Sequence, residues 1–162
     1  MKYRQSRIKN IRQHKIYYAI ASISLICVIF STIIFIENIQ INAHKQDFCS
    51  ALTGTSGCET VQSSIYSKTF GISNSVYGII GFTILLILSV ILAFKEQKIL
   101  KIITMSGILI AAITATYFLY LQTRVIHAYC IFCLVVDILS FALLVIEIYI
   151  LVHNSKHKHT QK

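Results

Sequence analysis

Charged residues are sparse in this chain, and long apolar runs separate them. Three runs carry no charged residue over 21, 26 and 22 positions, and a fourth, near the C-terminus, is largely apolar. A bilayer core of about 30 Å requires about 20 residues of helix, because each residue adds roughly 1.5 Å. Each run is therefore long enough to cross a membrane. The predicted spans are residues 16–36, 69–94, 102–123 and 130–152.

Isoleucine and valine are abundant in these runs, which in water would favour strands. In lipid, every backbone N–H and C=O group must be hydrogen-bonded within the protein, so apolar runs of this length are expected to be helices. We therefore expect an all-α membrane protein whose four helices form a bundle. The composition agrees, since 56% of the 162 residues are hydrophobic and 13% are charged. A soluble domain has about a quarter of its residues charged, so an ordinary soluble enzyme is excluded.

The basic residues predict how the spans are oriented. Of 15 Lys and Arg residues, 12 fall in three segments, with six in the N-terminal tail 1–15 and three each in 95–101 and 153–162. Because cytoplasmic segments are enriched in Lys and Arg, we expect both termini and the 95–101 hinge in the cytoplasm. The loop 37–68 and the turn 124–129 then lie outside. The formal net charge of +9 is therefore a topology signal rather than the sign of a nucleic-acid-binding arm.

Four of the five cysteines fall on the predicted outer side. Cys49 and Cys58 lie in the outer loop with eight residues between them, and Cys130 and Cys133 form a C-x-x-C at the start of the last span. Disulfides persist outside the cytoplasm, and two neighbouring pairs can pass a disulfide by thiolate attack. A helix start also favours the thiolate form. Cys27 stands alone within the first span, where it is expected to pack as a small apolar residue.

Two other interpretations of these cysteines remain open. Both pairs could be static structural disulfides. All four thiolates could instead bind one zinc ion, although structural zinc sites usually have close spacing in both pairs. The wide spacing between Cys49 and Cys58 makes zinc the less favoured interpretation, so no metal is expected.

Four motifs follow one another along the chain. They are Cys49-x₈-Cys58, Ser63-Ser64-x-Tyr66-Ser67, Phe70-Gly71-Ile72-Ser73-Asn74-Ser75-Val76-Tyr77-Gly78 and Ala128-Tyr129-Cys130-Ile131-Phe132-Cys133. Together they resemble the vitamin K epoxide reductase family. The match runs in the family's order from Cys49 to Asp137, and the four-span layout extends the resemblance over nearly the whole chain.

The resemblance implies a four-helix bundle around a quinone near the outer face. In that family, a loop pair exchanges electrons with a thioredoxin-like partner outside the membrane and then reduces the C-x-x-C disulfide, which reduces the quinone. By position, Cys49 would be the outward-facing shuttle thiol and Cys58 would relay to Cys130. Cys133, deeper in the last span, would face the quinone.

Other positions carry secondary roles. The resemblance makes Asn74 the residue that hydrogen-bonds a quinone carbonyl, and Ser64 matches a family Ser or Thr near the loop cysteine. Tyr129, directly before the C-x-x-C, is expected to shield it from water. Four residues after Cys133, where vertebrate members carry a tyrosine, this chain has Asp137. That departure weakens the case for epoxide reduction.

Two carboxyls fall within the last span. At about 100° per residue, Asp137 and Glu147 both lie roughly 40° from the direction of Cys133, on opposite sides of it. An intramembrane carboxyl is costly and is a functional hypothesis by default. Since quinone reduction consumes two protons, Asp137 is a candidate proton donor or carbonyl partner. The alternative is that Asp137 is a neutral, protonated acid that hydrogen-bonds to a neighbouring helix. For Glu147, a structural role is expected.

The sequence therefore predicts a single domain, 1–162, that acts as a quinone-dependent thiol–disulfide oxidoreductase in a prokaryotic cytoplasmic membrane. It would pass electrons from a separate, DsbA-like thioredoxin-fold protein to menaquinone, ubiquinone or phylloquinone. A separate partner is expected because a basic tail, and no fused thioredoxin-like domain, follows the last span. The alternatives are a vitamin K quinone or epoxide reductase in the narrow sense, and a non-catalytic scaffold or metal-binding protein. A DsbB-type oxidase is disfavoured because there the C-x-x-C comes first.

Overall fold

Four long helices make up most of the molecule. The structure is a computed structural model, and it describes residues 2–42, 49, 57–95 and 97–159. The long helices are α1 (Lys2–Asn42), α4 (Asn74–Phe94), α5 (Lys98–Tyr120) and α6 (Ile131–His159). Short elements join them: α3 (Gly57–Ser63), the 3₁₀ turn η1 (Ile65–Ser67), strands β1 (Lys68–Thr69) and β2 (Ile72–Ser73), and the π-helical turn η2 (Leu121–Ile126).

All four predicted spans are helices, and each is long and apolar enough to cross a membrane. The apolar stretches run over His14–Ile41, Asn74–Phe94, Lys98–Ile126 and Ile131–Val152. Many isoleucines on them point away from the bundle, such as Ile113 and Ile138, which are 62% and 65% exposed. Apolar side chains at such positions suit contact with lipid rather than water. The protein is thus a mostly helical, four-span membrane bundle.

The helix boundaries differ from the predicted ones where polar residues are accommodated. The charge at Glu37 marks the predicted end of the first span, yet α1 continues to Asn42 with Glu37 buried. The next residue, Asn38, is also buried and donates from Nδ2 to the Oε1 of Gln62 on α3, at 3.2 Å. Contacts with α3 therefore allow the helix to continue past its first acidic residue.

The second span begins later than its predicted start at residue 69. Residues 68–73 form a two-stranded antiparallel hairpin, with Lys68 opposite Ser73 and Thr69 opposite Ile72. Its two-residue turn has positive φ at both positions, 53° at Phe70 and 80° at Gly71. Such turns match the twist of the strands, and glycine adopts the left-handed region without strain. The hairpin leads directly into α4.

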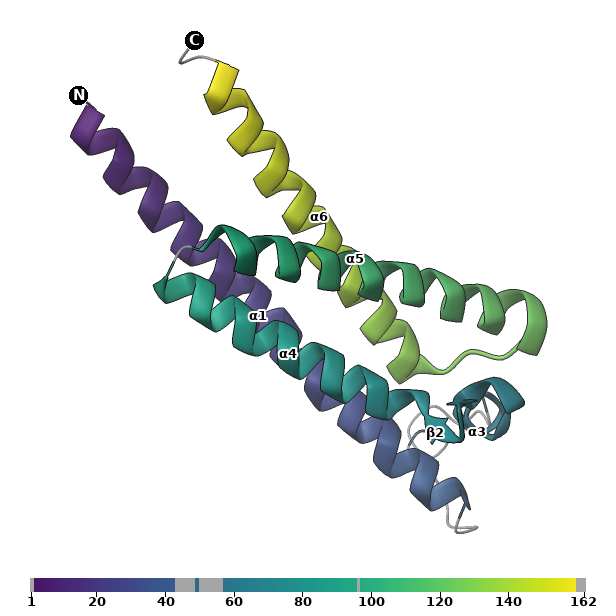
Figure 1. Cartoon of the computed structure of the whole chain (residues 1–162). Coiled ribbons are helices and arrows are strands. Elements are labelled where there is room, and N and C mark those ends of the chain that lie inside the picture. The colour runs from purple at the N-terminus through teal and green to yellow at the C-terminus, as the bar shows by residue number, and fades with distance from the viewer. Residues whose placement is uncertain (1, 43–48, 50–56, 96, 160–162) are drawn as a thin grey trace.

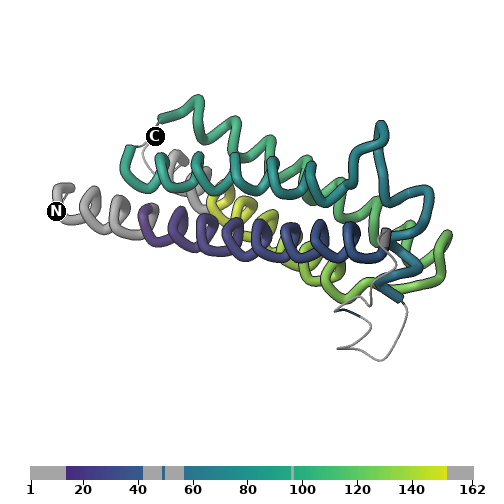
Figure 2. Tube along the Cα trace, turned by 90° about the horizontal axis from the view of Figure 1, so that it is seen from below, coloured from purple at the N-terminus to yellow at the C-terminus, as the bar shows by residue number. Residues whose placement is uncertain are grey.

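The bundle has two distinct ends (Figures 1 and 2). α1 enters and α6 leaves at one end, near the short connection between α4 and α5. At the other end lie α3, the hairpin and the segment that joins η2 to α6. We call this second end the cysteine end, because Cys49, Cys58, Cys130 and Cys133 belong to it. The main core lies between the helices and contains Ile20, Leu85, Ile108 and Leu143 among others.

Candidate functional site

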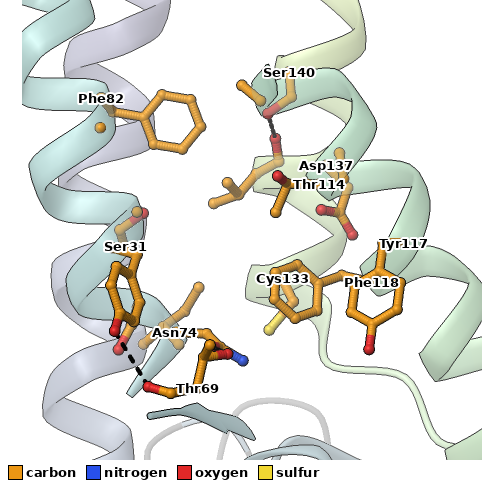
Figure 3. Close-up of a pocket in the computed structure, with 18 of the residues that line it drawn as sticks. Ser31, Thr69, Asn74, Phe82, Thr114, Tyr117, Phe118, Cys133, Asp137 and Ser140 are labelled. Carbon is orange, nitrogen blue, oxygen red and sulfur yellow. Dashed lines mark hydrogen bonds between the residues drawn. The ribbon is translucent and has the colours of Figure 1, made fainter. Parts of the chain in front are cut away.

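A cavity of about 670 Å³ opens between the helices toward the cysteine end. Most of its wall is apolar, formed by residues of α1, α4, α5 and α6. Figure 3 shows Ser31, Asn74 and Phe82 on one side, facing Thr114, Phe118, Cys133 and Asp137 across the space. Ligand sites are typically apolar clefts of this size with a few polar groups. The cavity therefore fits a flat, largely apolar molecule.

The spacing of α4 and α5 changes along the cavity wall. A Cβ added at Gly107 of α5 would lie 2.8 Å from the Leu85 Cδ2 of α4, so the two helices touch there. Further toward the cysteine end, a Cβ at Gly81 would meet nothing within 4 Å. Gly81 itself lines the cavity. The wall is thus closely packed at Gly107 and open at Gly81.

The cysteines of both pairs come together beside this cavity. Cys49 and Cys58 form a disulfide, whereas Cys130 and Cys133 are free thiols. Cys49, Cys58 and Cys130 are 1%, 2% and 1% exposed and share one buried cluster with Ile34 and Phe132. Cys133 packs against the same cluster and also lines the cavity. A continuous set of contacts therefore runs from the loop disulfide to the cavity wall.

Backbone contact holds the two cysteine-bearing segments together. Gly57, directly before Cys58, lies so close to the segment before Cys130 that an added Cβ would be 2.5 Å from the carbonyl oxygen of Tyr129. Only a residue without a side chain fits this approach. The sequence gives no hint of this role, because Gly57 stands in a loop of small residues.

Cys130 occupies the N-cap position of α6. Its Sγ accepts a hydrogen bond from the backbone N–H of Cys133, at 3.3 Å, as an N-cap side chain does with the third helical residue. Cys130 stands just before the span Ile131–Val152. The hydrogen bond from the Cys133 side chain lowers the pKa of the Cys130 thiol, with help from backbone N–H groups and against the effect of burial. The thiolate is thus favoured at Cys130.

Asp137 lies one turn beyond Cys133 and shares the cavity wall with it, as the helical spacing predicts (Figure 3). The side chain is 6% exposed. Glu147 is buried too, but it is not among the residues that line the cavity. The two acids therefore share burial and differ in surroundings.

Gln122 is a residue of the site that the sequence reasoning missed. It lies in η2, is 2% exposed and lines the cavity. Its Oε1 accepts a hydrogen bond from the backbone N–H of Cys130 at 3.0 Å, and its Nε2 donates to Oδ2 of Asp137 at 3.5 Å. An uncharged amide in an apolar run carries little signal by itself. Its position, eight residues before the C-x-x-C and at the end of a span, is the feature that could have pointed to it.

Asn74 is the first residue of α4 and lines the cavity, where it also holds the hairpin. Its Nδ2 donates to the carbonyl oxygen of Tyr66 at 2.6 Å, and its Oδ1 accepts from Oγ1 of Thr69 at 2.6 Å. An amide has two N–H donors and two acceptor lone pairs, so these bonds leave capacity toward the cavity. Asn74 is therefore fixed in place on the cavity wall.

Three other predicted residues lie differently from what their expected roles suggest. Ser64 lines the cavity, but its hydroxyl donates to the carbonyl oxygen of Val61 at 2.7 Å. The Tyr129 ring is 55% exposed, and Cys130 is covered instead by Ile34 and Phe132. Cys49, expected to face outward, is buried in its disulfide. In this state the disulfide faces the cluster around Cys130.

Among the described residues, no group of three or more His, Cys, Asp or Glu side chains is placed to hold a metal ion. The four cysteines are divided instead into a disulfide and two free thiols.

Comparison with known protein families gives one match. A family model described as the vitamin K epoxide reductase family matches residues 18–148 of the chain. The match includes parts of α1 and α6, all of α4 and α5, and both cysteine pairs. No individually curated protein matches the chain.

Proposed function

The chain belongs to the vitamin K epoxide reductase family, a family of membrane oxidoreductases, and from this premise we propose that it is a quinone-dependent thiol–disulfide oxidoreductase. It oxidises a separate thioredoxin-like protein outside the membrane and transfers the electrons to a membrane quinone. The product of this activity is a disulfide in the partner, which passes it on to other proteins. This assignment includes the orientation expected from the charges, with both termini in the cytoplasm and the cysteine end outside.

One observation carries the proposal. Cys133 lines an apolar cavity of about 670 Å³, while its motif partner Cys130 packs in the same buried cluster as the Cys49–Cys58 disulfide. A thiol at a cavity wall can reduce a bound quinone, and a thiol beside a disulfide can exchange with it. The fit to a quinone rests on the apolar wall and on two polar groups, Asn74 and Asp137, that can reach its carbonyl oxygens.

The exchange between the two pairs conserves electrons. With the loop pair reduced by the partner, the Cys58 thiolate attacks Sγ of Cys130 in a Cys130–Cys133 disulfide, and Cys133 leaves as a thiolate. The Cys49 thiolate then attacks Cys58, which closes the loop disulfide and releases Cys130. The favoured thiolate at Cys130 makes it a good leaving group. The described state, with the loop pair oxidised and the C-x-x-C reduced, fits the end of this step.

The second step returns the C-x-x-C to its disulfide. Cys130 and Cys133 form a new S–S bond and give up two electrons and two protons, which is what a quinone gains when it becomes a quinol. We assign Asp137 the transfer of one of these protons, since it lies one turn from Cys133 on the same wall. Asn74 orients the ring through its amide.

The loop disulfide must also become accessible to the partner. Cys49 is 1% exposed in the described state, so this cysteine has to become exposed before a partner thiol can reach it. We therefore assign the described arrangement to the inward-facing stage of the loop pair, and partner exchange to a second arrangement.

The test is quinol formation by the purified full chain. A reduced thioredoxin-like donor supplies electrons, and menaquinone, ubiquinone, phylloquinone and a vitamin K 2,3-epoxide are compared as acceptors. We expect quinol from at least one quinone and little or no epoxide reduction, because Asp137 replaces the family tyrosine. No quinol from any quinone would end the proposal, and efficient epoxide reduction would favour the narrower vitamin K activity.

A further inference from the structure

Gln122 joins the two reacting parts of the site. Its Oε1 accepts from the N–H of Cys130 at 3.0 Å, and its Nε2 lies 3.5 Å from Oδ2 of Asp137. The side chain is 2% exposed, so neither bond competes freely with water. One amide thus contacts the backbone of the cysteine that exchanges with the loop pair and the carboxyl on the cavity wall.

The orientation of this amide is fixed by its first bond. A backbone N–H can only donate, so the group of Gln122 that faces Cys130 must be its carbonyl oxygen. The NH₂ group therefore points toward Asp137. Swapping the two ends of the amide would place two N–H donors against each other at Cys130 and the amide oxygen against the carboxylate oxygen at Asp137, so the network allows one orientation.

We propose that Gln122 is a positioning residue that sets the pH range in which Asp137 can deliver its proton during quinone reduction. The inference rests on the proposed function and names a determinant of its second step. An N–H donor aimed at a carboxyl stabilises the ionised form more than the protonated form. Gln122 thus makes Asp137 readier to release its proton to the quinone.

Other groups around Asp137 do not supply this donor. The titratable side chains that line the cavity are Cys133 on the same helix, Tyr117 on α5, Tyr77 on α4 and Tyr66 in η1. The Cys130 thiol also interacts with Asp137. The described residues that line the cavity include no lysine, arginine or histidine. Removal of the Gln122 amide should therefore change the protonation of Asp137 directly.

The experiment measures one turnover of quinone reduction against pH. The full-length protein is reduced at its C-x-x-C, mixed with the quinone, and followed by quinol absorbance for the wild type and for Gln122→Leu and Gln122→Glu. Gln122→Leu removes the donor, so protonated Asp137 persists to higher pH. We expect the alkaline limb of the rate profile to move up by about one pH unit, the size of a hydrogen bond to a charged group.

Gln122→Glu distinguishes the loss of the N–H donor from a general folding defect. It keeps an oxygen for the N–H of Cys130 but places a second carboxyl beside Asp137. Two adjacent carboxyls share a proton, so the alkaline limb should move up further than in Gln122→Leu. In an Asp137→Asn background, Gln122→Leu should not shift the profile, because the carboxyl that titrates is gone.

Thr104→Val is the matched control. Thr104 is buried in α5, bonds to the carbonyl oxygen of Leu100 on its own helix and does not line the cavity. We expect it to lower stability slightly and to leave the pH profile in place. A uniform loss of rate at every pH in both Gln122 variants would overturn the inference. Wild-type protein that forms no quinol would instead contradict the proposed function.

Discussion

The two cysteine pairs share one buried cluster, but their surroundings differ. Cys49 and Cys58 are joined to each other, and neither of these two cysteines lines the cavity. Cys130 and Cys133 are free, stand at the start of α6, and have Gln122 and Asp137 beside them. The C-x-x-C thus has N–H donors, a carboxyl and an apolar cavity beside it, whereas the loop pair is described by its disulfide and its place in the buried cluster.

The two pairs lie close together, but the difference in their surroundings indicates different roles. Thiol exchange requires contact between sulfur atoms and little else. Quinone reduction also requires a place for the ring and groups that move protons. The loop pair meets the first requirement and the C-x-x-C meets both. The predictions below test whether the roles divide in this way.

The largest effect is expected from removing the cavity thiol. Cys133→Ser should abolish quinol formation with any electron donor, by at least about a thousandfold, because a reacting group is lost. Cys49→Ser should block electrons from a protein partner but leave quinone reduction by a small dithiol intact. Quinol absorbance with both donors separates the two variants.

Cys27→Ser is the control for loss of a cysteine. Cys27 is buried in the main core, away from the cluster that holds both pairs. The rate of quinol formation by Cys27→Ser should stay within about twofold of wild type, as expected for a residue outside the reacting groups. Equal loss of activity in Cys49→Ser and Cys133→Ser with the small dithiol would break the division of roles.

The second prediction concerns the loop pair. Cys58→Ala leaves Cys49 without its partner, so a mixed disulfide between Cys49 and the thioredoxin-like protein should accumulate. Non-reducing gel electrophoresis followed by mass spectrometry would identify it. The matched variant Cys130→Ala should accumulate no such species, because its loop pair can still resolve the intermediate. A static disulfide would give no mixed species in either variant.

The third prediction concerns the acid beside the C-x-x-C. Asp137→Asn should slow quinone reduction by about a hundredfold, a typical contribution of a positioned proton donor, and flatten its pH profile. Exchange between the loop pair and the partner should be unchanged. Glu147→Gln serves as the control, since Glu147 is buried in the same helix but does not line the cavity. An unchanged rate in Asp137→Asn at all pH values would remove Asp137 from the mechanism.

The smallest effect is on the titration of Cys130. The Cys133 side chain is the main cause of the lowered pKa of Cys130, so Cys133→Ala should raise that pKa. Cys133→Ser keeps a hydroxyl that can donate the same bond. Thiolate absorbance should reach its midpoint about one pH unit higher in the Ala variant, because losing a hydrogen bond to a charged group shifts a titration by roughly that much. Identical midpoints would show that the backbone N–H groups alone hold the thiolate.

The sequence predicts the helices well and their ends less well. Apolar runs long enough to cross a bilayer correspond to α1, α4, α5 and α6. The charge-free run ends before Glu37, whereas α1 continues to Asn42 with Glu37 buried. The hairpin at 68–73 carries little signal in the sequence, because Phe70 is an unusual residue for a positive φ.

Helical spacing predicts the part of the site that lies on a single helix. Cys133 and Asp137 are one turn apart, and both line the cavity. Gln122 and Gly57 lie on other segments, and their contacts arise only when those segments meet in the folded chain. Periodicity within one helix carries no information on such contacts. The cysteine burial likewise depends on Ile34 and Phe132, which come from different helices.

The approach of Gly57 to the carbonyl of Tyr129 has a mechanical consequence. Because residue 57 is a glycine, no side chain lies between the two backbones at this point. The distance between the two cysteine pairs is therefore set at this point by the approach of two backbones. A single methyl group at Gly57 would clash with that carbonyl oxygen and force the two backbones apart, which would lengthen the distance between the cysteine pairs.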